Sequence, residues 1–289
     1  MTIGTDHPAI ADSMQQVECE LVRRIESGAV DLPLLPQVAS RIMALIHDPS
    51  ADAARLSALI HQDQALAAHV LRIANSPAYM PRTPIVSLQH AVAMLGLTLL
   101  SEIAFTASLK AGAYQVPGHE ADVKQLWKHA LGSGAYAKEI ARLRRHNVES
   151  AYLCGLLHAI GKPVVLKTVA EVSKQLHTPL EREAVMTLLE GYHVRVGTLI
   201  AEKWGLPKQV AEAIAYSACY EHAPTFRQEV MITCLADRLA TYLLVPKAFD
   251  NHSVRDHPVF ADLNLYPNDV DTLLAAKDQI LAVVEAMAV

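Results

Sequence analysis

Aromatic side chains are scarce in this sequence of 289 residues and make up only 5% of it. A folded core must therefore be built mainly from Leu, Ala, Val and Ile, a composition that suits packed helices. Hydrophobic residues nevertheless reach 52%, and the mean hydropathy is +0.19. These values argue against intrinsic disorder and indicate a chain that buries a sizeable core.

Cysteine is also rare, and the four residues Cys19, Cys154, Cys219 and Cys234 show no close pairing pattern. They are typical of reduced thiols, so we expect a cytoplasmic protein. The N-terminus lacks the basic segment and apolar core of a secretory signal. The apolar run 91–100 has about half of the roughly 20 residues that a membrane span needs, so we expect no membrane segment.

A strong positive charge is absent as well, because the formal net charge is -5 and the pI is about 6.3. A nucleic-acid-binding domain favours a clustered basic face. The densest basic run, Arg142 to His146, is better explained as the C-terminal end of a helix, where the helix dipole favours positive charge. We therefore expect no nucleic acid among the partners.

Apolar residues recur at helical spacing along the whole chain, and no segment alternates as a strand does. Asp52, Asp63 and Ser87 each precede such a segment and are predicted N-caps. The stretch "AGAYQVPGHEAD", residues 111–122, is the best linker candidate because of its Gly and Pro content. The sequence predicts an all-α, two-lobed helical bundle: a smaller N-terminal helical lobe (1–115) packed on a C-terminal helical lobe (116–289) that ends in one amphipathic helix.

Four polar residues lie on mostly apolar segments of the second half: His129, His158, His193 and Asp237. Imidazole and carboxylate groups are the usual ligands of Zn, Mn or Fe, and separate helices can bring them to one ion. Such an ion turns bound water into a nucleophile for phosphoester cleavage. The alternative is a cluster of buried polar groups that bond one another or water. Spacing alone leaves both interpretations open.

Several motifs occur together in a recognisable order. The first half contains "LPLLP", "DQALAAHVLRIANSPAY" and "IVSLQHAVAMLGL", and the second half contains "LWKHAL", "GLLHAIGK" and "GYHVRVGTLIAEKWGLP". Between about Leu32 and Ser217 the chain resembles the HDOD family, the HD-related output domain. This resemblance implies a fold like that of HD-type metal phosphohydrolases, with an HD-like second lobe, and a role in bacterial signal transduction.

Catalytic HD proteins bind metal through a first His, a His-Asp pair, further His residues and a last Asp. By the resemblance, His129 matches the first His and His158 the His of the pair. His193 matches a later His, in an "H-x-x-x-G" element, and Asp237 matches the last Asp. If any ion is bound, the resemblance implies that these four residues hold it.

The chain departs from this catalytic pattern at two places. Ala159 stands where the pair has its Asp, and Ser217-Ala218 stands where catalytic relatives place one or two His. Alanine supplies neither charge nor a lone pair, so we expect no two-metal centre. A single, weakly held divalent ion is an alternative, and Cys219 or His222 could complete its coordination.

Three further features bear on the site, and two of them, Lys162 and one loop, have two interpretations each. Lys162 in "HAIGK" is either a phosphate contact, as in a catalytic relative, or an exposed cation at a helix end. Gly161 is expected to supply a turn. The loop with Tyr79, Met80 and Arg82 either binds a partner or packs against the second half.

The resemblance and its departures predict a non-catalytic regulatory module without a cofactor. It would act through a signalling protein partner or by binding a nucleotide second messenger, and it could form a homodimer. The HDOD-like segment and short flanks make up nearly all of the sequence, so we expect the input to arrive through a partner in trans or through a ligand that binds the chain itself. One alternative is a metal-dependent phosphohydrolase of nucleotides or cyclic dinucleotides with an altered centre. Another is a sensor that holds a nucleotide without cleaving it.

Overall fold

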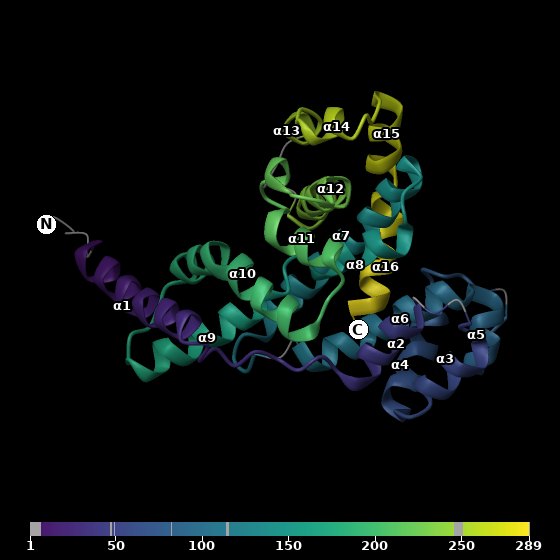
Figure 1. Ribbon diagram of the computed structural model, residues 1–289, viewed down its shortest axis with the longest axis horizontal. Coiled ribbons are helices and arrows are strands. Elements are labelled where there is room, and N and C mark those ends of the chain that lie inside the picture. The colour runs from purple at the N-terminus through teal and green to yellow at the C-terminus, as the bar shows by residue number, and fades with distance from the viewer. Residues whose placement is uncertain are drawn as a thin grey trace, which may run out of the picture.

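The protein is known through a computed structural model that describes residues 7–46, 48, 50–81, 83–113, 116–245 and 251–288. Every regular element in these ranges is a helix, as the sequence predicts (Figure 1). In chain order the elements are α1 (His7–Glu26), α2 (Gln37–Ile46), α3 (Ala53–Ile60), α4 (Gln64–Ala74), α5 (Leu88–Leu95), α6 (Leu97–Ala113), α7 (Glu120–Arg144), α8 (Val148–Leu157), α9 (Gly161–Gln175), α10 (Arg182–Trp204), α11 (Lys208–Tyr216), the 3₁₀ turn η1 (Tyr220–His222), α12 (Arg227–Leu244), α13 (Asn251–Arg255), α14 (Val259–Asp262), α15 (Pro267–Ala275) and α16 (Lys277–Ala288).

The short helices of the first half begin where the sequence predicts. The side chains of Asp52, Asp63 and Ser87 each accept a hydrogen bond from the backbone N–H three residues further on, at 2.7, 3.0 and 3.1 Å. Each cap satisfies one backbone donor that a helix start would otherwise leave without a partner. These three N-cap predictions are confirmed.

Helices α2 to α6 pack on one another, with α6 against α2, α4 and α5. In the second half α7 is central and packs against α8, α12 and α16. Its side chains Trp127 and Tyr136 are among the largest fully buried ones. α8 lies close to α7 because residue 155 is a glycine: a Cβ atom there would lie 2.5 Å from the carbonyl oxygen of Ser133. Helix α12 packs on both α7 and α8, so the three helices are mutual neighbours.

Helix α1 lies far along the chain from the helices it packs against, which are α9 and α10 (Figure 1). Glu18 and Tyr192 join α1 to α10 through a hydrogen bond of 2.7 Å. The predicted lobe boundary at residue 115 stays a prediction, but α1 packs mainly with α9 and α10, which belong to the second half.

The predicted linker is shorter than residues 111–122. Residues 111–113 continue α6, residues 120–122 already belong to α7, and residues 114 and 115 lie outside the described ranges. The predicted single C-terminal helix is also wrong: it breaks at Ala276 into α15 and α16 without a Gly or Pro to mark the break. Helix α16 packs back on α7 and α6.

One stretch of the described chain, Val148–Gln175, is long and apolar enough by length and composition to cross a membrane. The buried share of its most apolar window is 83%. It comprises α8, a turn and α9, both of which contact other helices along their length. The same values are found for core helices of soluble proteins, so they are weak evidence for a membrane span.

Candidate functional site

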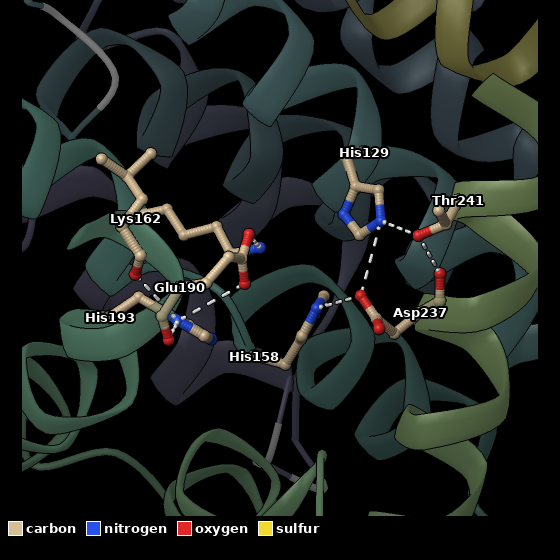
Figure 2. Close-up of polar contacts among 8 residues, drawn as sticks. His129, His158, Lys162, Glu190, His193, Asp237 and Thr241 are labelled. Atoms are coloured by element: carbon tan, nitrogen blue, oxygen red, sulfur yellow. Dashed lines mark hydrogen bonds and ion pairs between the residues drawn. The ribbon is translucent and has the colours of Figure 1, made fainter. Parts of the chain in front are cut away.

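Three of the four polar residues predicted as a site lie together. His129 comes from α7, His158 follows the last turn of α8, and Asp237 comes from α12 (Figure 2). One ligand atom from each residue lies within 4.8 Å of the others. His158 is buried, with 3% of its side chain exposed, whereas 42% of the Asp237 side chain is exposed. Solvent therefore reaches the cluster at Asp237 on α12 and not at His158 after α8.

Both ring nitrogens of His158 face oxygen atoms. Nδ1 lies 2.7 Å from the carbonyl oxygen of Gly155, and Nε2 lies 2.9 Å from Oδ1 of Asp237. A carbonyl oxygen only accepts, so Nδ1 carries a proton. Nε2 then either carries a second proton, which makes the ring a cation paired with Asp237, or offers its lone pair to a metal ion. The geometry thus limits His158 to these two roles.

His129 is held differently. The hydroxyl of Thr241 donates to the backbone oxygen of Asp237, so its own oxygen accepts from Nε2–H of His129 at 3.0 Å. The same nitrogen lies 3.4 Å from Oδ1 of Asp237. Burial lowers the pKa of His129 to about 4, against the opposing attraction of Asp237. His129 is therefore a neutral donor at neutral pH.

Asp237 is an anion in this setting. Its partial burial works to raise the pKa of the carboxyl group, but the hydrogen bond from His158 and the charge interactions with the neighbouring imidazoles outweigh burial. The pKa of Asp237 is consequently held far below its ordinary value. This is the condition of a carboxylate that is paired with a cation, either the protonated ring of His158 or a metal ion.

His193 lies outside this group, although the resemblance places it among the ligands. Its Nδ1 lies 3.1 Å from the carbonyl oxygens of Leu189 and Glu190 on its own helix (Figure 2). Burial lowers the pKa of His193, and repulsion by the positive charge of Lys162 lowers it further. The structure therefore brings together three of the four predicted residues, and the fourth forms contacts within α10.

Lys162 is not an exposed cation at a helix end, which was the second of its two interpretations. Its ammonium group lies 2.7 Å from Oε1 of Glu190, and only 15% of its side chain is exposed. It stands beside His193, apart from the three clustered residues (Figure 2). Its charge is thus neutralised within the protein.

Ala159 lies in the turn between α8 and α9, and Gly161 is the first residue of α9. Ala159 is 7% exposed and presents a methyl group where a catalytic pattern has a carboxylate. The expectation that Gly161 supplies a turn is wrong, because it begins α9 and has no positive φ. A Cβ atom at Gly161 would lie 2.0 Å from the carbonyl oxygen of His193. Gly161 is therefore required for the close approach of α9 to α10.

The residues proposed to complete a metal site do not join the cluster. Ser217 is buried at the end of α11, Ala218 is exposed, and Cys219 follows with partial exposure. His222 is exposed in the η1 turn. Within the described chain, the group of metal-capable side chains that includes His158 has three members.

Two His and one Asp fit one divalent transition-metal ion. Three protein ligands with an open position are the usual set of a catalytic zinc ion. They do not fit two ions, because each of a pair of ions needs a bridging or additional ligand, and Ala159 supplies none. If an ion binds, His129, His158 and Asp237 would hold it, and it would lower the pKa of a bound water.

The predicted partner loop has one inward and one outward side chain. Tyr79 is partly buried against the core, whereas Met80 is 80% exposed. Met80 also has a φ of 38°, a conformation that costs free energy for a residue other than glycine. Arg82, the third predicted residue, lies outside the described residues. The inward side chain of Tyr79 thus agrees with a packing role, and partner binding by the loop stays a prediction.

With this geometry established, comparison with protein families gives a match between residues 32–220 and the HDOD domain. The chain belongs to the HDOD family. The match includes His129, His158 and His193 but ends before Asp237. Asp237 therefore comes from α12, a helix that lies wholly beyond the HDOD match.

Solved structures share the HDOD fold. An HDOD domain protein of unknown function from Geobacter sulfurreducens has a TM-score of 0.71 at 27% identity, over 94% of this chain and 98% of that one. A Shewanella amazonensis SB2B protein, named as a candidate metal-dependent phosphohydrolase, has a TM-score of 0.72 at 20% identity, over 94% and 99%. A candidate signal transduction protein from Marinobacter aquaeolei VT8 has a TM-score of 0.68 at 23% identity, over 99% and 67%. The last two likenesses show the fold alone.

Two curated proteins also match this HDOD chain. An uncharacterized protein of Treponema pallidum (strain Nichols) is 27% identical over 222 residues, which cover 73% of this chain and 42% of that protein. Ribonuclease Y of Thermus thermophilus is 27% identical over 144 residues, or 50% of this chain and 23% of the enzyme. The chain spans less than half the length of both.

Proposed function

We propose that the chain is a non-catalytic regulatory module of bacterial signal transduction, with the two lobes predicted from its sequence. The observation that carries this proposal is the direct contact of 2.9 Å between His158 and Asp237, together with an alanine at the next position, 159. This contact joins α8 to α12 directly, and residue 159 supplies no carboxylate to bridge a metal ion. The cluster then stabilises the fold and does not activate water.

Such a module acts through what it binds. We expect a signalling protein partner in the cytoplasm or a nucleotide second messenger as the input. The exposed side chain of Met80, on a loop with strained backbone, supports a protein contact at that loop. Pull-down with the wild type and with Met80→Ser would test this, because loss of a specific partner in the variant is expected.

A metal-dependent phosphohydrolase is the second candidate. It is favoured by the ligand atoms of His129, His158 and Asp237 lying within 4.8 Å, which suffices for one ion. In this case the proton on Nε2 of His158 would be replaced by the ion. The activity would require a single ion to bind the phosphate and to activate water.

Metal content and turnover separate the two candidates. We would measure Mn, Fe and Zn in untagged protein by elemental analysis, and then hydrolysis of cyclic dinucleotides with added Mn²⁺. The non-catalytic proposal expects substoichiometric metal and no turnover in the wild type. Near-stoichiometric metal, together with turnover that disappears in His158→Ala, would overturn it.

Ala159→Asp provides a matched gain-of-function test. The variant returns a carboxylate to the position of the missing bridging group, so metal uptake should exceed that of the wild type. Ala159→Asn has nearly the same shape without the charge and serves as the control. Equal metal content in the wild type and in Ala159→Asp would show that residue 159 does not explain the loss of activity.

A further inference from the structure

A cavity of about 550 Å³ lies away from the His129 cluster. Its walls come from the loop after α4, from α5 and α6, from α7 and α8, and from the C-terminal helix α16. Helix α16 packs on both α6 and α7 (Figure 1), while α8 packs on α7 and α5 packs on α6. No residue of the metal-capable cluster lines it. The cavity is therefore a separate site where the first and second halves of the chain meet.

One wall of the cavity carries a buried carboxylate with an oxygen atom that lacks a partner. Glu102 on α6 is only 3% exposed, and its Oε2 accepts a hydrogen bond from the ammonium group of Lys138. Its Oε1 is buried and has no hydrogen-bond partner. A buried acceptor without a partner is destabilising, so an oxygen in this position calls for a donor from outside the protein.

The charges that face the cavity favour a cation over an anion. Three carboxylates line it, from Glu102, Glu139 and Glu149, against the two cations Lys138 and Arg142. Lys138 is paired with Glu102, and Arg142 is paired with Glu139. Glu149 is close enough to act on Glu102 by charge repulsion. One negative charge is thus left in excess, which opposes phosphate and carboxylate ligands.

The remaining surface of the cavity is apolar or aromatic. Tyr79, Leu95, Leu99, Val283 and Met287 line it. The hydroxyl group of a further lining residue, Tyr152, is already bonded to Thr106 at 2.7 Å. An occupant would therefore place an apolar body against these side chains and direct a donor toward Glu102.

We propose that this cavity binds a small organic ammonium compound, a primary or secondary amine with an apolar or aromatic body. Its N–H group donates to Oε1 of Glu102, and its positive charge balances the excess carboxylate. Because its walls belong to both halves of the chain, a bound amine ties α6, α7 and α16 together. This proposal goes beyond the regulatory role and holds whether or not the His129 cluster is catalytic.

The test uses amines and their uncharged counterparts on the full chain. Isothermal titration at pH 7 with 2-phenylethylamine and hexylamine is compared with 2-phenylethanol and hexanol. The amines should bind at least about tenfold more tightly than the alcohols, which corresponds to one charge-assisted hydrogen bond. Equal binding of amines and alcohols, or no binding of either amine up to about 10 mM, would overturn the proposal.

Two variants assign the binding to this cavity. Glu102→Gln keeps the shape but not the charge, and should weaken amine binding by about tenfold or more. Val283→Trp fills the cavity from the partly exposed face of α16 and should abolish binding, so it replaces Glu102→Gln if that variant does not fold. Glu190→Gln, a carboxylate outside the cavity that pairs with Lys162, is the control and should bind like the wild type. Unchanged binding in Val283→Trp would place the amine elsewhere and reject this site.

Discussion

Nε2 of His158 lies 2.9 Å from Oδ1 of Asp237, so that a residue at the end of α8 and one in the middle of α12 meet directly. The other nitrogen of the ring is bonded to the carbonyl oxygen of Gly155. The ring therefore cannot rotate away without losing two contacts. The structural interpretation requires this direct contact to stay in place, whereas the catalytic interpretation requires a metal ion at Nε2 of His158.

Asp237→Asn should destabilise the protein by removing the negative charge opposite His158. We expect a loss of about 1–2 kcal/mol in the free energy of unfolding, less than for a fully buried pair because Asp237 is partly exposed. Urea unfolding at pH 7 measures it. Asp271→Asn, which removes an exposed partner of Arg255, is the control and should change the value by less than about 0.5 kcal/mol. Equal effects of the two substitutions would mean that the contact at His158 adds no stability.

Gly161→Ala should destabilise the protein by about 3 kcal/mol or more, because its Cβ atom would clash with the backbone of α10. The added atom would lie 2.0 Å from the carbonyl oxygen of His193, which no side-chain rotation relieves. Gly191→Ala on α10 is the matched control, since nothing lies within 4 Å of its Cβ position. That change should stabilise the protein by up to about 1 kcal/mol through helix propensity. Thermal unfolding of both variants gives the comparison, and a neutral Gly161→Ala would contradict the close packing.

Glu102→Gln should change how stability depends on pH. Burial raises the pKa of Glu102, despite the opposing effect of Lys138. The folded state therefore retains the proton of Glu102 better than the unfolded state does. This proton stabilises the folded protein fully below the ordinary carboxyl pKa, and the stabilisation is lost as the pH rises through the higher pKa of the folded state. Glutamine does not titrate. The stability of the variant relative to the wild type should thus increase with pH from about 4.5 upward, and urea midpoints across that range would show it. A constant difference between the two proteins would mean that Glu102 has an ordinary pKa.

Asn75→Asp should loosen the loop that carries Tyr79 and Met80. The side-chain amide of Asn75 donates to the backbone oxygens of Leu71 and Ile85, and its oxygen accepts from the N–H of Ile85, each at 2.8 Å. The aspartate loses both donors, and we expect a cost of about 1–3 kcal/mol.

Hydrogen exchange is the measurement for this variant. The amides of Ser76 and of residues 78–80 should exchange faster in Asn75→Asp, while those of α12 should be unchanged. Uniformly faster exchange would indicate global destabilisation and would remove the specific link between Asn75 and the loop.

The start of a helix was predictable because it depends on neighbouring residues. Asp52, Asp63 and Ser87 act on backbone groups three positions away, and this distance is visible in the sequence. The break at Ala276 was not predictable in the same way, since no Gly or Pro marks it. Helix α16 instead follows the surface of α7, and a contact with a remote helix leaves no local signal.

The candidate site was predictable in its members and not in its geometry. His129, His158 and Asp237 stood out as polar residues on apolar segments, and they do lie together. His193 is likewise a polar residue on an apolar segment, yet its Nδ1 is hydrogen-bonded to the carbonyl oxygen of Leu189 on its own helix. The unpartnered oxygen of Glu102 had no signal at all, because a single Glu in an apolar run does not reveal whether it faces a cavity.

The sequence by itself determined the all-α class, the helix starts at Asp52, Asp63 and Ser87, the family and the absence of a carboxylate at position 159. These properties follow from residue identity and from interactions over a few positions along the chain. Only the tertiary structure decided which histidines meet Asp237, why residue 161 must be glycine, and where a cavity remains between the two halves. Those outcomes depend on how closely remote helices approach, which is set by the packing of many side chains at once.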